Sequence, residues 1–277
     1  PDQTSTIISK VWGMCGPLRD DGVSYGDYLE QLTYFDEYAK PPYKRETGIP
    51  AGCGWSDMNT LKGAELESKY KSILETLGEQ GGTLGKIFQG AVNKISNAAI
   101  LYRIVQMIDR ENWVSMSTDV KGEIYEGLLQ KNAEDVKSGA GQYFTPRPLI
   151  RAMVECIRPE PRKTIADPCC GSGGFLLAAQ SYLADPKHYT LDREAKEFLK
   201  RDTFRGWEIV PATFKLSLMN LFLHNIGDLY GEVPITLGDA LLTDPGERFD
   251  YVLTNPPFGK KSSLTFTNEE GEQEEED

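Results

Sequence analysis

The residues Asn255, Pro256, Pro257 and Phe258 follow a run of strand-forming residues, "FDYVLT" (249–254). Proline has no backbone N–H, so two prolines in succession cannot extend a sheet. This turn therefore presents carbonyl acceptors without competing donors. The side-chain oxygen of Asn255 and the carbonyl of Pro256 can each accept one hydrogen of an exocyclic amine. Both bonds would draw electron density toward the amine nitrogen and make it more nucleophilic, while Phe258 can stack on the ring that carries it.

A second candidate is the Gly-rich segment "DPCCGSGGF" (167–175), which reads as a strand, a turn and the start of a helix. Glycines let a backbone approach a ligand closely and adopt positive φ. Leu176 stands where a dinucleotide-binding fingerprint requires glycine, and no G-K-[ST] sequence follows. A tight turn without a ligand is the alternative interpretation. The Cys169–Cys170 pair is interpreted as small residues packed in this turn.

Two acids are predicted at the ends of later strands. Glu208 lies in "FRGWEI" (204–209), where an acid can accept both hydroxyls of a ribose. Asp239 lies in "ITLGDA" (235–240) and can accept a hydrogen bond from an adenine amino group. Either acid alone is weak evidence, because acids at strand ends often only cap turns. Together with the Gly-rich turn, they indicate a pocket for a cofactor that contains adenosine.

Strands and helices alternate through this part of the sequence, which predicts a parallel sheet with crossover helices. The predicted strands are 163–168, 204–209, 235–240 and 249–254, and the helices between them are 174–184 and 211–224. Ligands of such sheets bind beyond the carboxyl ends of the strands. An earlier helix is predicted from a Thr145 cap and Pro146 to about Ile157. Its inward face is expected to carry Leu149, Ile150, Met153, Val154 and Ile157.

The first half of the sequence predicts helices without a catalytic constellation. Amphipathic stripes predict helices at 65–80 and 97–109, the second capped by Asn97, and a more polar helix at 120–135. The inward stripe of 65–80 consists of Leu66, Tyr70, Ile73, Leu74 and Leu77. Pro and Gly residues predict a loop at 40–55. We expect a helical scaffold or docking domain at 1–138 and a second domain at 139–277, joined at Gly139 and Gly141.

Composition limits the remaining classes of protein. The net charge is −12, but the segment "EEGEQEEED" (269–277) holds seven acids, so the other 268 residues carry only −5. We expect this acidic tail to be disordered, and a body without a basic tract argues against strong DNA binding by this chain alone. No apolar stretch approaches the ~20 residues of a membrane span. Five cysteines without a C-x-x-C pair and two separated histidines predict no metal site and a reduced, cytoplasmic protein.

Five motifs occur in a fixed order: "GQYFTP", "DPCCGSGGF", "GWEI", "GDAL" and "NPPF". Their combination resembles N6-adenine DNA methyltransferases, and with the helical N-terminal region it resembles the modification (M) subunit of type I restriction-modification systems. The resemblance covers almost the whole chain. It implies an α/β fold, in which a helical domain precedes a Rossmann-like methyltransferase domain that depends on S-adenosylmethionine. It also implies a cytoplasmic complex of DNA, two M subunits, a specificity (S) subunit and a restriction (R) subunit, with no membrane.

The resemblance also implies roles for individual residues. Asn255, Pro256, Pro257 and Phe258 would bind and activate a target adenine flipped out of the duplex. Glu208 would hold the ribose of the cofactor and Asp239 its adenine. The other residues implied at the cofactor are Gln142, Tyr143, Phe144, Thr145, Pro146, Arg147, Asp167, Gly171, Ser172, Gly173 and Gly174.

Two features depart from the family pattern. The first helical region has only "LEQLTYFDEY" (29–38) where the family has a longer apolar run, and the chain ends 19 residues after Phe258. We therefore expect a truncated catalytic domain, and we do not expect activity from this fragment alone. The alternatives are a methyltransferase that acts on protein glutamine or on RNA, and a catalytically silent assembly subunit.

Overall fold

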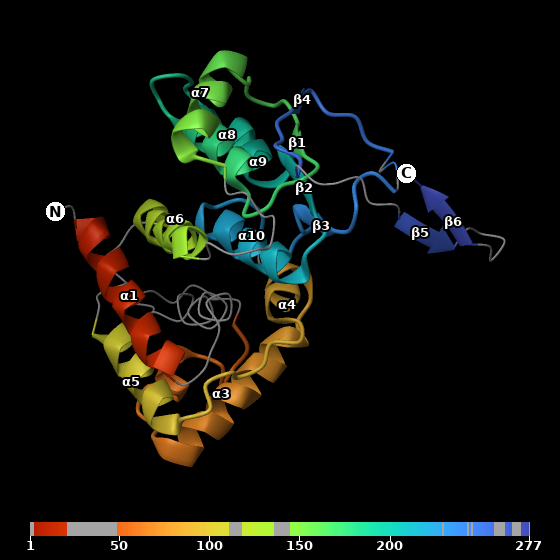
Figure 1. Ribbon diagram of the computed structural model, residues 1–277. Helices are drawn as coiled ribbons and strands as arrows, with labels where there is room; N and C mark the ends of the chain where they lie inside the picture. The colour runs from red at the N-terminus through yellow and green to blue at the C-terminus, as the bar shows by residue number, and fades with distance from the viewer. Residues whose placement is uncertain are drawn as a thin grey trace.

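The computed structural model describes residues 3–20, 49–110, 118–135, 145–228, 230–242, 244, 246–257, 264–267 and 273–276. A mainly helical part precedes an α/β part in the chain (Figure 1). The buried apolar residues form one connected core that extends from Ile7 to Leu253 and so includes both parts. The predicted boundary near 138 lies outside the described residues, and the division into two domains stays a prediction. No helix among the described residues is long and apolar enough to cross a membrane.

The helical part confirms the three helices that the sequence predicts there. Its helices are α1 (Gln3–Asp20), the 3-10 helix η1 (Trp55–Asp57), α3 (Gly63–Gly78), α4 (Gly82–Phe88), α5 (Ala98–Asp109) and α6 (Thr118–Asp135). All five apolar residues of the predicted stripe on α3 are buried. The Asn97 side chain caps α5 by accepting the Ala99 N–H at 2.9 Å. Residues 49–54 of the predicted loop contain no helix or strand, and 40–48 and 29–38 lie outside the described residues.

The α/β part contains a four-stranded, fully parallel sheet in the order β3-β2-β1-β4. Its strands are β1 (Ile165–Asp167), β2 (Phe204–Glu208), β3 (Ile235–Leu237) and β4 (Tyr251–Val252). Each is shorter than the segment predicted for it. Because all four strands run in the same direction, their carboxyl ends lie at one edge of the sheet. The strand order reverses between β1 and β4, and such a point is where ligands bind in open α/β sheets.

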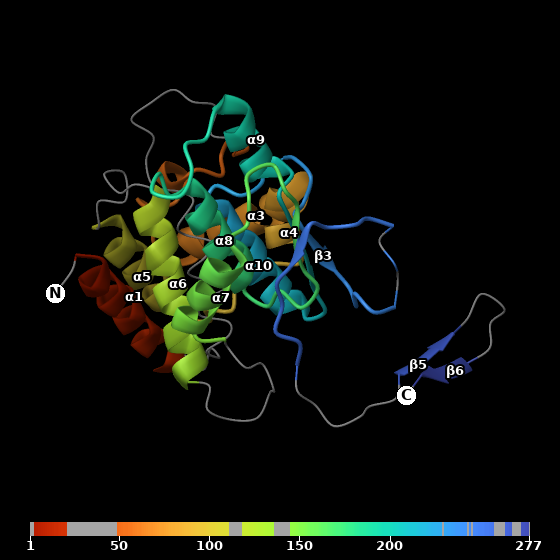
Figure 2. The same cartoon turned by 90° about the horizontal axis from the view of Figure 1, so that it is seen from above.

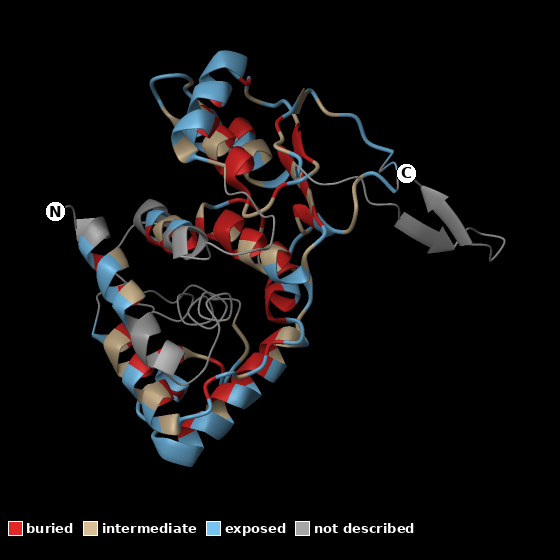
Figure 3. Ribbon diagram, in the orientation of Figure 1, coloured by how far each residue is buried: buried red, intermediate tan, exposed pale blue. Residues whose placement is uncertain are grey.

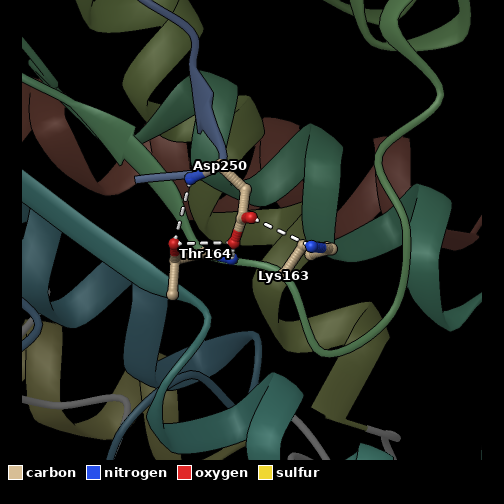
Figure 4. A network of polar contacts seen from close by, with 3 residues as sticks. All are labelled: Lys163, Thr164 and Asp250. Atoms are coloured by element: carbon tan, nitrogen blue, oxygen red, sulfur yellow. Dashed lines mark hydrogen bonds and ion pairs between the residues drawn. The ribbon is translucent and has the colours of Figure 1, made fainter. Parts of the chain in front are cut away.

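A polar network fixes β4 against β1 at the opposite, amino-terminal edge (Figure 4). The Asp250 carboxylate accepts hydrogen bonds from the Thr164 backbone N–H at 2.9 Å and the Thr164 hydroxyl at 3.1 Å, and pairs with Lys163 at 3.1 Å. The Asp250 N–H in turn donates to the Thr164 hydroxyl at 3.1 Å. These bonds set the register in which Ile165 lies beside Tyr251. The residues directly after β1 and those directly after β4 are thereby placed next to one another.

Four helices accompany the sheet: α7 (Arg147–Ile157), α8 (Gly174–Ala184), α9 (Arg193–Arg201) and α10 (Pro211–Leu223). Helix α10 contacts β2 and β3 and also contacts α4 and α6 of the helical part (Figure 1). Its residues are largely buried, as are those of β1 and β2 (Figure 3). Helix α10 therefore joins the sheet to the helical part. Helix α9 is absent from the sequence prediction.

Helix α7 begins and ends close to the predicted positions, but two details of the prediction are wrong. Only Ile150 and Val154 of the five residues predicted to face inward are buried. Leu149, Met153 and Ile157 are 53%, 36% and 47% exposed, because α8 covers only one side of the helix. Thr145 does not cap α7 either. Pro146 occupies the cap position, and the Thr145 hydroxyl bonds elsewhere, as described below.

The acidic tail also differs from the prediction of disorder. Its residues Gln273–Glu276 form strand β6, which pairs antiparallel with β5 (Leu264–Thr267). The backbone bonds of this pair give the tail a regular structure that its composition alone would not predict. The two strands stand apart from the body of the molecule (Figures 1 and 2).

The contact between α6 and α10 gives a first prediction. A Cβ on Gly122 of α6 would lie 2.5 Å from Nε2 of His224, directly after α10. We expect Gly122→Ala to lower the free energy of unfolding by about 1–3 kcal/mol, the usual cost of overpacking. Denaturant titration would measure it. Gly13→Ala on α1 is the matched control, because no atom lies within 4 Å of its Cβ position, and it should instead stabilise by about 0.5–1 kcal/mol.

The same prediction can be tested by removing the neighbour. In a His224→Ala background, the three atoms nearest to the new methyl group are absent, and Gly122→Ala should destabilise less. Equal destabilisation in both backgrounds would show that the imidazole is not the cause.

Candidate functional site

The carboxyl edge of the sheet brings three predicted acids together. Asp167 ends β1, Glu208 ends β2, and Asp239 follows β3 by two residues. All three affect the thiol of Cys169: burial raises its pKa most, and Asp167, Glu208 and Asp239 raise it further. The three carboxylates therefore lie close enough to Cys169 to act on it electrostatically, at the edge where a ligand is expected.

Asp167 is 1% exposed, and burial raises the pKa of its carboxyl to about 6. The Thr254 hydroxyl and the Cys169 N–H, which donates at 3.1 Å, oppose this shift, while the charge of Glu208 adds to it. A positive charge placed nearby would favour the ionised form. The electrostatics at this edge therefore suit a cationic ligand.

The other two acids bond to the backbone of their own turns. Glu208 Oε1 accepts the Val210 N–H at 2.8 Å, and Asp239 Oδ1 accepts the Leu241 N–H at 2.9 Å. Both bonds are those of turn-capping acids, the alternative interpretation of these residues. Each uses one carboxylate oxygen, so capping a turn and binding a ligand are compatible.

The Gly-rich turn has the backbone conformation that its glycines predict. Gly171 and Gly173 have φ of +53° and +84°, which side chains rarely tolerate. A Cβ on Gly173 would also collide with the Leu221 side chain of α10. The carbonyl of Ser172 accepts a hydrogen bond from Asn220 Nδ2 at 2.8 Å. Glycine is thus required at 173 by both conformation and space.

Arg147, predicted at the cofactor, connects the helical part to the Gly-rich turn. Its Nη2 pairs with Glu126 of α6 at 2.8 Å. Its Nη1 fills the space in which a Cβ on Gly174 would stand. Burial lowers the pKa of the Arg147 guanidinium, and the Glu126 carboxylate opposes this shift. Arg147 therefore lies against Gly174 at the start of α8, where it packs on the end of the Gly-rich turn.

The turn after β4 is joined to the start of α7. Asn255 Nδ2 donates to the Thr145 hydroxyl at 3.0 Å, although the two residues are 110 positions apart. This bond orients the amide and leaves Oδ1 as its acceptor end. Pro256 and Pro257 are exposed. Phe258, Gln142, Tyr143 and Phe144 lie outside the described residues.

Comparison with known proteins identifies the family. Residues 116–276, more than half of the chain, match the family described as N-6 DNA Methylase. The chain belongs to the N-6 DNA methylase family. The match includes the Gly-rich turn, the three acids and Asn255 to Phe258.

Curated members of this family resemble the chain along most of its length. It is 38% identical to the type I restriction enzyme StySPI methylase subunit of Salmonella potsdam and 37% identical to the EcoKI methylase subunit of Escherichia coli K12. Each comparison covers 94% of this chain and 52% of the relative, so the chain spans about half their length. The resemblance to type I modification subunits, predicted from the motifs, is confirmed.

A solved structure of the same class shows the same fold. The methyltransferase subunit of a type I restriction-modification system from Streptococcus thermophilus superposes with a TM-score of 0.69 at 18% identity. The superposition covers 94% of this chain and 64% of the other. The predicted fold class, a helical region followed by a methylase-like parallel α/β sheet, is confirmed.

Sequence reasoning missed three residues that support the candidate site. Glu126 pairs with Arg147, and Asn220 bonds to Ser172. Leu221 occupies the space beside Gly173. They lie on α6 and α10, helices that the sequence predicted without assigning a role to these positions. An asparagine within the apolar run "LSLMNLFL" (216–223) is the one signal that could have drawn attention to Asn220.

Proposed function

We propose that the protein containing this chain methylates N6 of adenine in DNA, as the modification subunit of a type I restriction-modification complex. The observation that carries the proposal is the bond from Asn255 Nδ2 to the Thr145 hydroxyl. It holds an amide oxygen as an acceptor at the edge of the sheet that also carries the Gly-rich turn. Membership of the N-6 DNA methylase family supports the same reaction.

The described residues fit S-adenosylmethionine as the cofactor. Its sulfonium and ammonium groups are cations, and three acids gather at this edge around Cys169. In the proposal, Glu208 accepts the ribose hydroxyls and Asp239 the adenine amino group. Asp167 and the turn from Gly171 to Gly174 line the site, with Thr145, Pro146 and Arg147 beside it. Gln142, Tyr143 and Phe144 belong to the site by resemblance only.

The chain's own residues then activate the adenine. Asn255 Oδ1 and the Pro256 carbonyl accept the two hydrogens of the N6 amine, and Pro257 keeps the turn rigid and free of a competing N–H. The nitrogen becomes more tetrahedral and nucleophilic without a strong general base. Phe258 stacks on the flipped base. S-adenosylmethionine would supply the methyl group by cleavage of its S–CH3 bond and leave as the neutral thioether, while N6 would lose one of its two protons to solvent.

We also propose that sequence selection lies with partners. Outside the acidic tail the chain carries a net charge of −5 and has no basic tract, so it offers little of the electrostatic attraction that drives non-specific DNA binding. A specificity subunit that holds DNA between two modification subunits would supply base and phosphate contacts, and a restriction subunit would join for cleavage. A cytoplasmic location is part of this proposal.

Incubation of the full-length protein with methyl-labelled S-adenosylmethionine and DNA tests the proposal. We expect the label in N6-methyladenine after nucleoside analysis, with site selectivity only when the specificity subunit is present. Label in RNA or in glutamine would contradict the DNA substrate. Cofactor binding without label in any polymer would indicate a silent assembly subunit. Selective methylation without the partner would contradict the division of labour.

A further inference from the structure

Asn220 lies where α10 packs against the Gly-rich turn. Its side chain is 0% exposed, and its Nδ2 donates to the carbonyl of Ser172 at 2.8 Å. The next residue, Leu221, occupies the space beside Gly173. Two consecutive residues of α10 therefore contact two consecutive residues of the turn.

These contacts hold the Ser172–Gly173 peptide at both of its polar ends. The Gly173 N–H donates to the Cys170 carbonyl at 2.8 Å, and the Ser172 carbonyl accepts from Asn220. Gly171 and Gly173 add little restriction of their own, because glycine has access to many backbone conformations. The direction of this peptide therefore depends on its two hydrogen bonds, and only the bond from Asn220 comes from outside the turn.

Apolar residues flank Asn220 along α10. Leu218, Met219 and Leu221, its neighbours on α10, are each 0% exposed. Asn220 Oδ1 is buried and has no hydrogen-bond partner among the described residues. Burying an unpaired amide oxygen is costly, and a leucine of similar size would avoid that cost. The bond to Ser172 is the one interaction at this position that leucine could not make.

We propose that Asn220 is a positioning residue that holds the Gly-rich turn in the conformation that binds the cofactor. The inference rests on the proposed function, because it takes this turn as part of the cofactor site. Asn220 acts through the Ser172 carbonyl and does not itself contact the reacting atoms. A turn released from Asn220 would reach its binding conformation only part of the time, and the apparent affinity for the cofactor would fall by that fraction.

The test compares Asn220→Leu with Met219→Leu, a substitution of similar volume at the adjacent buried position. Hydrogen exchange of the amides from Gly171 to Gly174 would be measured without cofactor, and the Kd for S-adenosylmethionine by calorimetry. In Asn220→Leu we expect exchange of these amides to accelerate and the Kd to rise about tenfold, as for a turn in its binding conformation about a tenth of the time. The control should match the wild type in both.

Steady-state kinetics separates positioning from loss of fold. A released turn raises the KM for S-adenosylmethionine and leaves kcat at saturating cofactor nearly unchanged, whereas partial unfolding lowers kcat. If Asn220→Leu fails to fold, Asn220→Ala replaces it. Wild-type exchange and affinity in a folded variant, or faster exchange throughout α10 and the sheet, would overturn the inference. A wild-type protein that does not bind S-adenosylmethionine would refute the proposed function, and the exchange data would still decide whether Asn220 holds the turn.

Discussion

Asn255→Ala is expected to lower the rate of methyl transfer by about 10²–10³-fold, the cost of losing one positioned hydrogen-bonding group at a reaction centre. The proposed role of Asn255 is toward the substrate amine, and its described bond is to Thr145 rather than to one of the three acids. Cofactor affinity should therefore stay close to that of the wild type. Single-turnover assays on DNA and calorimetry with S-adenosylmethionine, on the same preparation, would measure both quantities. Turnover at the wild-type rate would exclude this role for Asn255.

Thr145→Val is the matched companion of that variant. Valine keeps the shape of threonine but removes the hydroxyl that accepts Asn255 Nδ2 at 3.0 Å. The amide is still present but is no longer held in one orientation, so methyl transfer should fall by less than in Asn255→Ala. An unchanged rate would show that this bond does not orient the amide during the reaction.

Local sequence patterns predicted the helices whose apolar residues recur with helical periodicity. Helix α3 buries the five residues of its apolar stripe, and α8 spans the same residues, 174–184, that the sequence predicts. The pattern of α7 has the same period, yet Leu149, Met153 and Ile157 remain exposed. Periodicity fixes which residues share a face, but only the neighbouring elements decide how much of that face is covered.

Helix α9 is strongly charged, and apolar periodicity does not predict such a helix. Its sequence, "REAKEFLKR", buries only Ala195, so an apolar stripe hardly exists. Asp192 is a residue type that favours the N-cap position, and its side chain accepts the Ala195 N–H at 2.7 Å. A helix-start signal was thus present without the apolar face that normally accompanies it.

The candidate site likewise has features that local patterns predict and features that depend on how distant elements pack. The Gly-rich turn and the strand-end acids were predicted because their roles depend on local conformation and strand direction. The bonds between Thr145 and Asn255 and between Asn220 and Ser172 join residues 110 and 48 positions apart. Such pairs follow from how α7 and α10 pack, which no local pattern contains. The order of the motifs predicted the family. The resemblance to the family implied roles for the site residues, and these two hydrogen bonds do not test those roles.

Gly173→Val is expected to remove measurable binding of S-adenosylmethionine. Gly173 has φ of +84°, a conformation that a β-branched residue adopts only at high cost, and its Cβ would collide with Leu221. The turn must therefore change its path, and α10, packed between the sheet and the helical part, cannot easily yield. Calorimetry on the folded variant would measure the loss.

Gly81→Val supplies the control for the same change in side chain. Gly81 has φ of −82° and ψ of 172°, an extended conformation that valine favours, and no atom lies within 4 Å of its Cβ position. This variant should bind the cofactor like the wild type. Gly173→Ala in a Leu221→Ala background separates the two causes in the turn: it removes the collision but keeps the unfavourable φ, so any recovery of affinity measures the steric part. A folded Gly173→Val protein with unchanged affinity would place the cofactor elsewhere, because no bound ligand could then depend on the path of this turn.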